Sequence, residues 1–400
     1  MGKRIFVTGM GIISAIGKNI PDTFLSLSQC RSGLGRIKQI DTIHKNELLV
    51  AEVGFSNSEL AAMLGITDQQ GYTRTTLLAL VAANEAVASA KITDMNQIPT
   101  GLISANTVGG MDKSEIYYYD YLKLKKPNSY IETHDCADST EKLADHFGIN
   151  GFISTVSTAC SSAANAMLLG ARLIQNGTLK RVVAGGTECL TKFHINGFNS
   201  LKILDPDPCK PFDQNRKGIN LGEGAGYVIL EGEEALQNPE RIICELSGWG
   251  NACEAFHQTA SSPDGNGAFL AMKKALDMSG LKPADITYIN AHGTGTDNND
   301  VSEGHAIENL FAPTIPYVSS TKPFTGHTTS AAGVVESIIS ILGMKNSMIF
   351  PNLNFTQQID ELNFSPVSEL KTNIEQKHIL SNSFGFGGNN TALIFSKFGE

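Results

Sequence analysis

A cysteine at the start of a predicted helix is the residue in this chain best placed to act as a nucleophile. The segment 156–166 reads VSTACSSAANA, so a β-type run ends at Cys160 and an alanine-rich helix begins directly after it. A thiol there lies beside free backbone N–H groups and the positive end of the helix dipole, and both favour the thiolate. A buried, inert thiol is the usual alternative for a free cysteine.

Two histidines lie on loops rich in glycine and threonine. His292 belongs to the segment 290–296, NAHGTGT, which follows a predicted strand. Ligands of α/β sheets bind beyond the C-terminal ends of strands, so His292 is a candidate site residue. His327 ends the segment 320–327, STKPFTGH. Each histidine taken alone could make only local hydrogen bonds.

A lysine, a glutamate and a glycine-rich turn complete the segments of interest. Lys322 precedes His327, and Glu336 lies on the helix predicted after it, where the two residues by themselves would form an ordinary surface pair. The segment 382–390, NSFGFGGNN, is rich in glycine but lacks the Lys-Ser/Thr and the helix that follow a phosphate-binding loop. A tight turn between two strands is therefore the favoured interpretation.

Short apolar runs alternate with helical patterns along most of the chain. This alternation predicts an α/β fold whose sheets are largely parallel and covered on both faces. The predicted strands are Arg4–Thr8, Gly101–Asn106, Arg181–Ala184, Gly226–Glu231, Ile286–Asn290, Tyr317–Ser319, His378–Ser381 and Thr391–Ser396. The predicted helices are Thr75–Ala90, Ser162–Asn176, Gly267–Ser279, Val301–Phe311 and Gly333–Lys345.

The order of elements indicates a duplication, with one half opening near Gly9 and the second near Gly226. Between them, Leu204–Asn220 is polar and rich in turn residues, which is typical of a domain linker or a surface excursion.

Composition excludes several classes of function. A net charge of −9 argues against a nucleic-acid partner, which requires a basic face. Seven cysteines without a CxxC pair indicate reduced thiols and no structural zinc site. No run reaches the roughly 18 apolar residues of a membrane span, and Gly9 and Gly11 interrupt any signal-peptide core. We therefore expect a soluble cytoplasmic protein with no membrane insertion.

Taken together, these segments resemble one family. From the opening VTGMGIIS to the closing NSFGFGG, the chain resembles the type II β-ketoacyl-acyl-carrier-protein synthases of the thiolase-like superfamily. The resemblance includes KPFDQNRKGINLGEGAGYVILE, at 210–231, and the order Cys, HGTGT, GH, GFGG. It implies two duplicated βαβαβαββ halves that form a five-layer α-β-α-β-α core. Residues 1–235 would carry the nucleophilic cysteine, and 236–400 the two histidines.

The resemblance also implies an activity. This is the decarboxylative Claisen condensation of an acyl thioester with malonyl-acyl-carrier protein, giving 3-oxoacyl-acyl-carrier protein and CO2 in fatty-acid or polyene/polyketide-like synthesis. Cys160 would carry the acyl group, while His292 and His327 would stabilise the enolate that decarboxylation leaves. The backbone N–H groups of Cys160 and Phe386 would form the oxyanion hole.

Further roles follow from the same resemblance. Lys322, paired with Glu336, would orient His327. Thr294 and Thr296 would hydrogen-bond the pantetheine arm of the substrate. No metal or organic cofactor is implied, because the thioester itself carries the activation.

Two positions bear on the choice of acyl group. Phe386 would gate the acyl pocket, and Val108 would line it with a side chain smaller than the family often has, leaving room for longer acyl groups.

The polar segment Glu132–Asp138 replaces an apolar helix of the family, and unpaired burial of its aspartates would be costly. We therefore hypothesise a specialised synthase; simple sequence drift is the alternative.

Acyl carrier protein, acyl- or malonyl-loaded, is the partner that the resemblance implies. Because this carrier is acidic, basic residues should steer it, and Arg74, Lys180, Arg181 and Lys202 are the candidates. Asn389 stands where the family commonly has threonine. The chain would form a homodimer or a heterodimer with a related chain-length subunit.

Three alternative functions fit the sequence less well. A biosynthetic thiolase would carry a second cysteine in the glycine-rich turn 385–390, which has none. A papain-like protease has a similar cysteine-to-histidine spacing, but its cysteine signature is absent and His327 would be unexplained. An inactive or partner-dependent chain-length or scaffold subunit of a heterodimeric synthase usually lacks the cysteine that is present here.

Overall fold

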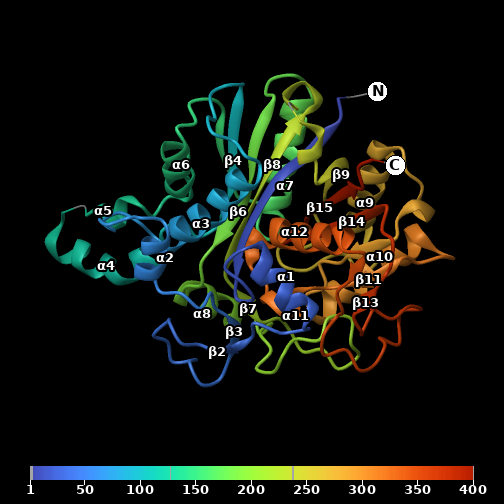
Figure 1. Ribbon diagram of the computed structural model, residues 1–400. Helices are drawn as coiled ribbons and strands as arrows, with labels where there is room; N and C mark the ends of the chain where they lie inside the picture. Colours follow the sequence, from blue (N-terminus) through green and yellow to red (C-terminus); the bar gives the residue numbers. More distant parts are fainter. Residues whose placement is uncertain (1–2, 127, 237, 400) are drawn as a thin grey trace.

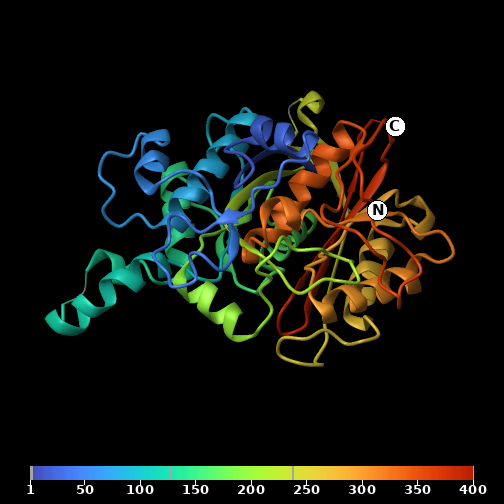
Figure 2. The same ribbon diagram turned by 90° about the horizontal axis from the view of Figure 1, so that it is seen from below.

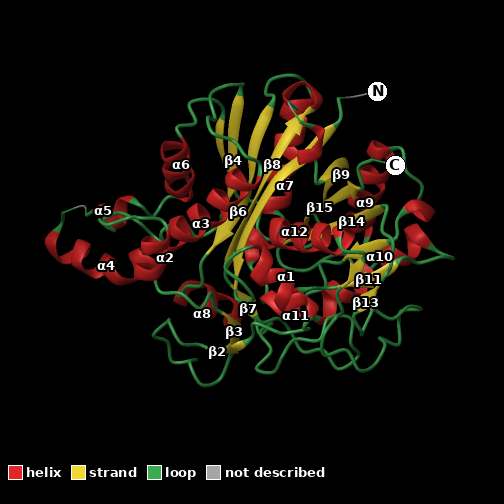
Figure 3. Ribbon diagram, viewed as in Figure 1, coloured by secondary structure: helices red, strands yellow, loops and turns green. Residues whose placement is uncertain are grey.

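Two sets of five strands form the centre of the molecule (Figures 1 and 3). The computed structural model describes residues 3–126, 128–236 and 238–399. The first set has the spatial order β5-β4-β6-β8-β1: β1 (Ile5–Ser14), β4 (Thr100–Ala105), β5 (Ile153–Val156), β6 (Arg181–Glu188), β8 (Gly224–Gly232). The second has the order β11-β10-β14-β15-β9: β9 (Cys244–Cys253), β10 (Tyr288–Asn290), β11 (Tyr317–Ser319), β14 (His378–Gly385), β15 (Asn389–Ser396).

Both sets repeat the same topology. If the strands of each set are numbered along the chain, both have the spatial order 3-2-4-5-1. In each set three neighbouring strands are parallel and the fifth strand runs antiparallel to the fourth. The two sets join where β1 pairs with β9 through Phe6–Glu245 and Val7–Cys244. The structure thus has the repeat that the resemblance implies.

The helices complete five layers, as Figures 1 and 2 show. α3 (Arg74–Ser89) and α6 (Cys136–Phe147) cover the outer face of the first sheet. α9 (Asn266–Ser279) and α10 (Asp297–Phe311) form the outer layer beside the second sheet. The central layer contains α7 (Ser162–Gln175) and α12 (Ala332–Lys345), which contact strands of both sheets. The predicted thiolase-like architecture, α-β-α-β-α, is therefore confirmed.

Sequence explains why α12 occupies the centre. Residues 332–344 read AGVVESIISILGM and every one of them is buried. A helix that is apolar on all sides must be covered on all sides, which a position between two sheets provides. Glu336 is the exception in charge, and its partner lies in the functional site.

The remaining elements lie around this core. They are α1 (Ile20–Ser28), α2 (Asn57–Met63), α4 (Met111–Leu124), α5 (Ser129–Glu132), α8 (Lys192–Ser200), α11 (Lys322–Thr325), β2 (Gly35–Arg36), β3 (Leu49–Ala51), β7 (Leu221–Gly222), β12 (Met348–Ile349), β13 (Lys371–Thr372) and the 3₁₀ turns η1 (Glu233–Ala235), η2 (Pro239–Arg241), η3 (Pro283–Asp285) and η4 (Thr329–Ala331).

Two expectations about the middle of the chain are wrong. The second half does not open near Gly226, because the strand there, β8, closes the first half. The second half opens at β9, whose glycines and polar residues interrupt the apolar pattern that predicts a strand. Leu204–Asn220 is neither a linker nor a surface excursion. Its Phe212 backbone N–H donates to Asp300 at 2.7 Å, and Asp213 accepts from Gln357 at 2.9 Å, so this segment is packed against the second half.

The polar segment is accommodated without unpaired buried charge. Asp135 is exposed and caps α6 by accepting from the backbone N–H of Ala137 at 2.8 Å. Asp138 pairs at 2.8 Å with Lys142, one turn along the same helix. The cost expected for burying these aspartates is thus avoided by exposure and by pairing.

Beside this segment, α4 and α5 extend from the body as an arm (Figures 1 and 2). The arm exposes large apolar side chains: Ile116, Tyr118, Tyr119, Leu122 and Leu124. Such a concentration of exposed apolar surface is typical of an interaction site.

Two of the four candidate docking residues are buried in ion pairs. The Arg74 guanidinium donates to both carboxylate oxygens of Glu223, at 2.9 and 2.6 Å, and Arg181 donates to Glu231 at 2.7 Å. Neither arginine is free to meet a partner, which corrects that expectation. Lys180 and Lys202 are exposed.

Replacing Glu223 with alanine should destabilise the fold, because it leaves the Arg74 charge buried without its counter-ion. The expected loss is about 3–5 kcal/mol in the free energy of unfolding, measured by chemical denaturation. Glu234→Ala, which breaks the exposed pair with Lys3, is the control and should stay close to wild type. Equal stability of the two variants would contradict this account.

Candidate active site

The turn that carries the thiol is a strained connection between β5 and α7. Ala159 adopts a left-handed backbone conformation with φ of +50°, directly before Cys160. The Ser162 hydroxyl holds this turn, because it accepts from the Thr158 N–H at 2.8 Å and donates to the Ala159 carbonyl at 2.6 Å. The Cys160 side chain is thereby placed at the start of α7 with only 5% of its surface exposed.

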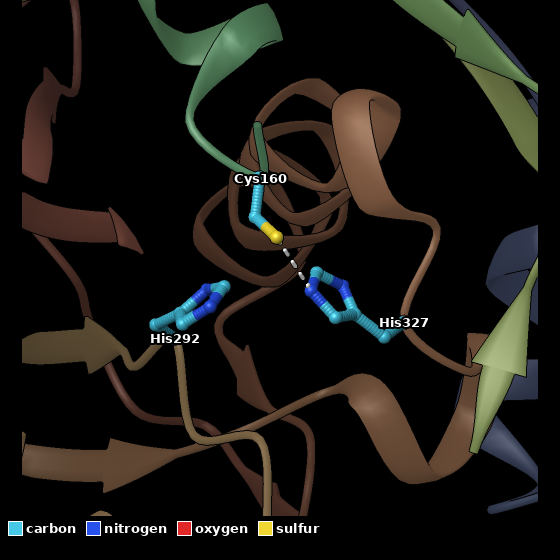
Figure 4. A group of neighbouring side chains, drawn as sticks. All are labelled: Cys160, His292 and His327. Carbon is cyan, nitrogen blue, oxygen red and sulfur yellow. Dashed lines mark hydrogen bonds between the residues drawn. The ribbon is translucent and has the colours of Figure 1, made fainter. Parts of the chain in front are cut away.

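His327 lies against the thiol. Its Nε2 is 3.0 Å from the Cys160 Sγ, and Figure 4 marks this contact with a dashed line. Its backbone N–H donates to the Asn220 carbonyl at 2.7 Å, which ties the histidine to the first half of the chain. Gly326, with φ of +65°, permits this approach because a Cβ there would lie 2.7 Å from the Leu221 carbonyl. Two segments distant in sequence thus meet at the sulfur.

His292 completes the group. The reactive atoms of Cys160, His292 and His327 lie within 4.8 Å of one another, and the two imidazole rings are 5.3 Å apart at 80° (Figure 4). The sequence analysis selected all three residues, and the structure brings them together.

Two buried carboxylates that sequence analysis missed hold the His292 loop. Glu303 accepts the backbone N–H groups of His292 and Gly293, each at 2.8 Å. Asp300 accepts those of Thr294 and Gly295, at 3.0 and 3.1 Å. Both acids lie on α10, which follows the loop directly. The segment 297–304, DNNDVSEG, contains both acids, but only the position of the helix shows that they face the His292 loop.

Lys322 contacts His292 rather than His327, contrary to expectation. Its ammonium is buried and lies 3.3 Å from the His292 Nδ1, donates to the His292 carbonyl, and forms an ion pair with Glu336. An ammonium has only donors, so Nδ1 must accept. The ring proton of His292 is therefore on Nε2. For His327, Nδ1 has no hydrogen-bond partner among the residues that the structure describes.

Burial and the Lys322 charge keep both imidazoles neutral. Burial lowers the pKa of His292 and of His327 well below the ordinary value, and the positive charge of Lys322 lowers both further. Burial also raises the pKa of the Cys160 thiol to about 12, against the opposing effect of Lys322. The resting site is thus a neutral thiol beside a neutral imidazole, not the thiolate expected from the helix terminus.

The glycine-rich turn 385–390 also approaches Cys160. The Phe386 N–H faces the Cys160 thiol and lowers its pKa, against the larger effect of burial. Gly385 is in close contact with the nucleophile turn, because a Cβ there would lie 2.8 Å from the Thr158 carbonyl and 3.2 Å from the Cys160 nitrogen. The Phe386 ring stacks on Phe198 with ring centres 5.9 Å apart.

A cavity of about 1060 Å³, including its open mouth, leads to the three reactive side chains. Thr294, Thr296 and Phe386 line it as expected, and the hydroxyls of the two threonines are 2.8 Å apart. Lys202 and Lys217 also line it. Val108 does not line this cavity. It is buried in the apolar cluster beneath α3, so its predicted contact with the substrate is not seen here.

The cysteine and two histidines are also the one group with metal-ligand spacing in the described part of the chain. A cation there would face the buried ammonium of Lys322, which contacts His292. Repulsion between two cations in a poorly solvated site is costly. The donor set therefore fits proton and thiol chemistry better than metal binding.

Gly385→Ala should disable the site without unfolding the protein, because the added Cβ pushes the thiol and the Phe386 N–H apart. We expect acylation of Cys160 to slow on the order of 10²-fold, measured by intact-protein mass spectrometry. Gly197→Ala, in α8, is the matched control, because its Cβ would meet nothing within 4 Å. Acylation at the wild-type rate in Gly385→Ala would show that this contact is unimportant.

Comparison with known proteins agrees with this geometry. The family models for the β-ketoacyl synthase N-terminal and C-terminal domains match residues 2–235 and 243–356. The chain is 32% identical over 411 residues to 3-oxoacyl-[acyl-carrier-protein] synthase 2 of Staphylococcus aureus, covering 99% of both chains. It is 34% identical to the Synechocystis enzyme of the same name, covering 99% of this chain and 98% of the relative.

Solved structures give the same result. The ishigamide ketosynthase/chain length factor superposes with a TM-score of 0.93 at 27% identity, covering 100% of both chains. The ketosynthase ApeO in complex with its chain length factor ApeC from Xenorhabdus doucetiae gives a TM-score of 0.86 at 28% identity, covering 99% of this chain and 98% of that one. Matches to both family models, over nearly the whole length and with a cysteine and two histidines converging in one cavity, show that this chain belongs to the β-ketoacyl synthases.

Proposed function

We propose that this protein condenses an acyl thioester with malonyl-acyl-carrier protein to give 3-oxoacyl-acyl-carrier protein and CO2. The observation that carries the proposal is the placement of one thiol, two neutral imidazoles and the Phe386 N–H at the buried end of a single cavity. A nucleophile, a base and electrostatic donors are the groups that acyl transfer requires.

Acyl transfer to the enzyme comes first. The His327 Nε2, 3.0 Å from the sulfur, takes the thiol proton as Cys160 attacks the carbonyl of the acyl thioester. A bond forms between the sulfur and the acyl carbon, and the bond to the carrier thiol breaks. The proton passes from His327 to the departing thiol. The backbone N–H groups of Cys160 and Phe386 stabilise the tetrahedral oxyanion.

Condensation follows in the same place. The malonyl C–C bond breaks, CO2 leaves, and the electron pair becomes an enolate on the thioester oxygen. His292 donates its Nε2–H to that oxygen, and His327 does so when its proton is on Nε2. The enolate carbon then attacks the acyl-Cys160 carbonyl, the C–S bond breaks, and the released thiolate takes a proton from solvent.

Cys160→Ala should abolish both the acyl adduct and condensation, because Cys160 is the one thiol among the described residues that line the cavity. The measurement is intact-protein mass spectrometry and product formation with a panel of acyl-carrier thioesters. Cys253→Ala, which removes an exposed thiol, is the control and should load as wild type does. Condensation at the wild-type rate by Cys160→Ala would overturn the proposal.

Lys322→Met should move the acid limb of the acylation rate to higher pH. The Lys322 charge adds to burial in lowering the pKa of both histidines, so its removal raises them, and His327 is protonated at a higher pH where it can no longer accept the thiol proton. Burial raises the pKa of Glu336 to about 7 even beside Lys322, so Glu336 then takes up a proton.

The measurement is the pH dependence of Cys160 acylation between pH 5 and 8. Lys345→Met, at the exposed end of α12, is the matched control and should leave the profile unchanged. A Lys322→Met profile whose acid limb coincides with that of wild type would contradict the assigned role of Lys322.

The two halves divide this work in the proposal. Residues 1–235 contribute the thiol, and residues 236–400 contribute both histidines and the Phe386 N–H. The repeated strand order supports this division, and so does the chain connection 233–243 between β8 and β9.

A boundary at residue 235 stays a prediction, as does the cytoplasmic location. No helix in the described part of the chain has the length and apolarity that crossing a membrane needs.

Acyl carrier protein is the proposed substrate carrier, and it would approach the cavity mouth. Lys202 and Lys217 lie there and can attract an acidic carrier, whereas Arg74 and Arg181 are buried elsewhere.

For assembly, we propose a dimer in which the α4–α5 arm contacts a second chain of the same fold. The ketosynthase–chain length factor complex among the similar structures supports a heterodimer; a homodimer stays open as the alternative.

A specialised polyene or polyketide-like pathway is the proposed context. Its support is the similarity to the ishigamide ketosynthase/chain length factor, at a TM-score of 0.93. The alternative, an inactive or scaffold chain-length subunit, is less well supported because the cysteine and both histidines are present and converge. Preference for unsaturated over saturated acyl groups in the adduct assay tests the pathway; equal loading of both would count against it.

A further inference from the structure

Two loops meet at the thiol, and the contacts between them set the surroundings of the sulfur. The Phe386 N–H reaches Cys160 from the turn between β14 and β15. Gly387 and Gly388, which follow, have φ of +81° and +77°. Backbone hydrogen bonds join these glycines to the segment after β9, because the Gly387 N–H donates to the Gln258 carbonyl at 2.8 Å and the Glu254 N–H donates to the Gly388 carbonyl at 3.0 Å. These bonds leave the position of the turn relative to the start of α7 to other contacts.

Asn389 stands directly after the two glycines, as the first residue of β15. Its side-chain carbonyl accepts from the Ser161 hydroxyl at 3.0 Å and from the Asn165 amide at 2.9 Å. Ser161 follows the nucleophile, and Asn165 lies one turn further along α7. The side chain therefore bridges the turn that carries the Phe386 N–H and the helix start that carries Cys160.

A third donor reaches the same oxygen from β9. The Asn251 amide lies 2.9 Å from the Asn389 carbonyl oxygen and 2.9 Å from that of Asn165. Thr391, one β-strand pleat beyond Asn389, donates to Asn165 at 2.9 Å as well. Hydrogen bonds that share members in this way reinforce one another, and removing the Asn389 oxygen takes away the one acceptor that Ser161, Asn165 and Asn251 share.

We propose that Asn389 is a positioning residue that fixes the Phe386 N–H on the Cys160 sulfur. It does not touch the reacting atoms and acts through the two loops that it joins. The consequence is a defined oxyanion hole, and a thiol pKa lower than burial alone would leave. The catalytic part of this inference rests on the proposed condensation, whereas the effect on the thiol does not.

The test compares Asn389→Ala, Asn389→Thr and wild type in two assays. One is alkylation of the Cys160 peptide by iodoacetamide from pH 7 to 10, followed by mass spectrometry. The other is the steady-state rate of condensation. Asn176→Ala is the matched control, since it changes an exposed asparagine at the other end of α7. Thermal unfolding of each variant separates loss of function from loss of fold.

Asn389→Ala should alkylate about threefold to tenfold more slowly than wild type at a given pH, because a weakened N–H contact raises the pKa of the thiol and lowers its thiolate fraction. Its kcat should fall about tenfold or more with KM little changed, since a donor for the oxyanion is displaced. Asn389→Thr, which keeps one acceptor oxygen, should recover part of both losses.

Wild-type alkylation and kcat in a folded Asn389→Ala would overturn the inference. So would a loss of kcat that merely follows the folded fraction, with an unchanged alkylation profile, since Asn389 would then only stabilise the fold. If wild type alkylates but condenses no substrate, the proposed function fails while the alkylation comparison still tests Asn389.

Discussion

A buried ammonium beside a histidine is the interaction on which this site depends. Lys322 is almost completely buried, and Glu336 on the central helix balances its charge. A buried ammonium without a counter-ion would be very costly. The position of Lys322 therefore depends on helix α12, which carries the Glu336 carboxylate. With the ammonium at the His292 Nδ1, the ring can carry its proton only on Nε2, the nitrogen free to act in the cavity. One ion pair thereby sets the direction of the proposed donor and adds to burial in keeping its ring neutral.

The duplication explains why residues far apart in sequence converge. Cys160 follows β5 and His327 follows β11, and each of these is the third strand of its own half; a helix of the central layer begins after each. Equivalent positions in two halves that share a central layer lie close to each other, which places the sulfur 3.0 Å from the imidazole. His292 follows β10, the neighbouring strand. The cavity therefore opens at the C-terminal ends of parallel strands in both sheets.

Sequence reasoning was most successful where a local pattern has one structural meaning. Tyr317–Ser319 is a strand with the predicted bounds, because a short apolar run between turn residues has few alternatives. β9 was missed because Glu245, Gly248 and Gly250 interrupt its apolar pattern. The reactive residues were found from their flanking motifs. Their supporting contacts were not: Glu303, and the contact of Lys322 with His292 instead of His327, depend on packing between elements that no local pattern contains.

The protonation state of His292 tests the central claim most directly. Wild-type protein labelled with ¹⁵N in histidine, with His292→Asn for assignment, would show the state of each ring nitrogen by NMR. We predict a neutral His292 ring with its proton on Nε2 down to pH 6, because burial and the Lys322 ammonium lower its pKa well below the ordinary value. A proton on Nδ1, or an imidazolium at pH 6, would show that Lys322 does not set the direction of this donor.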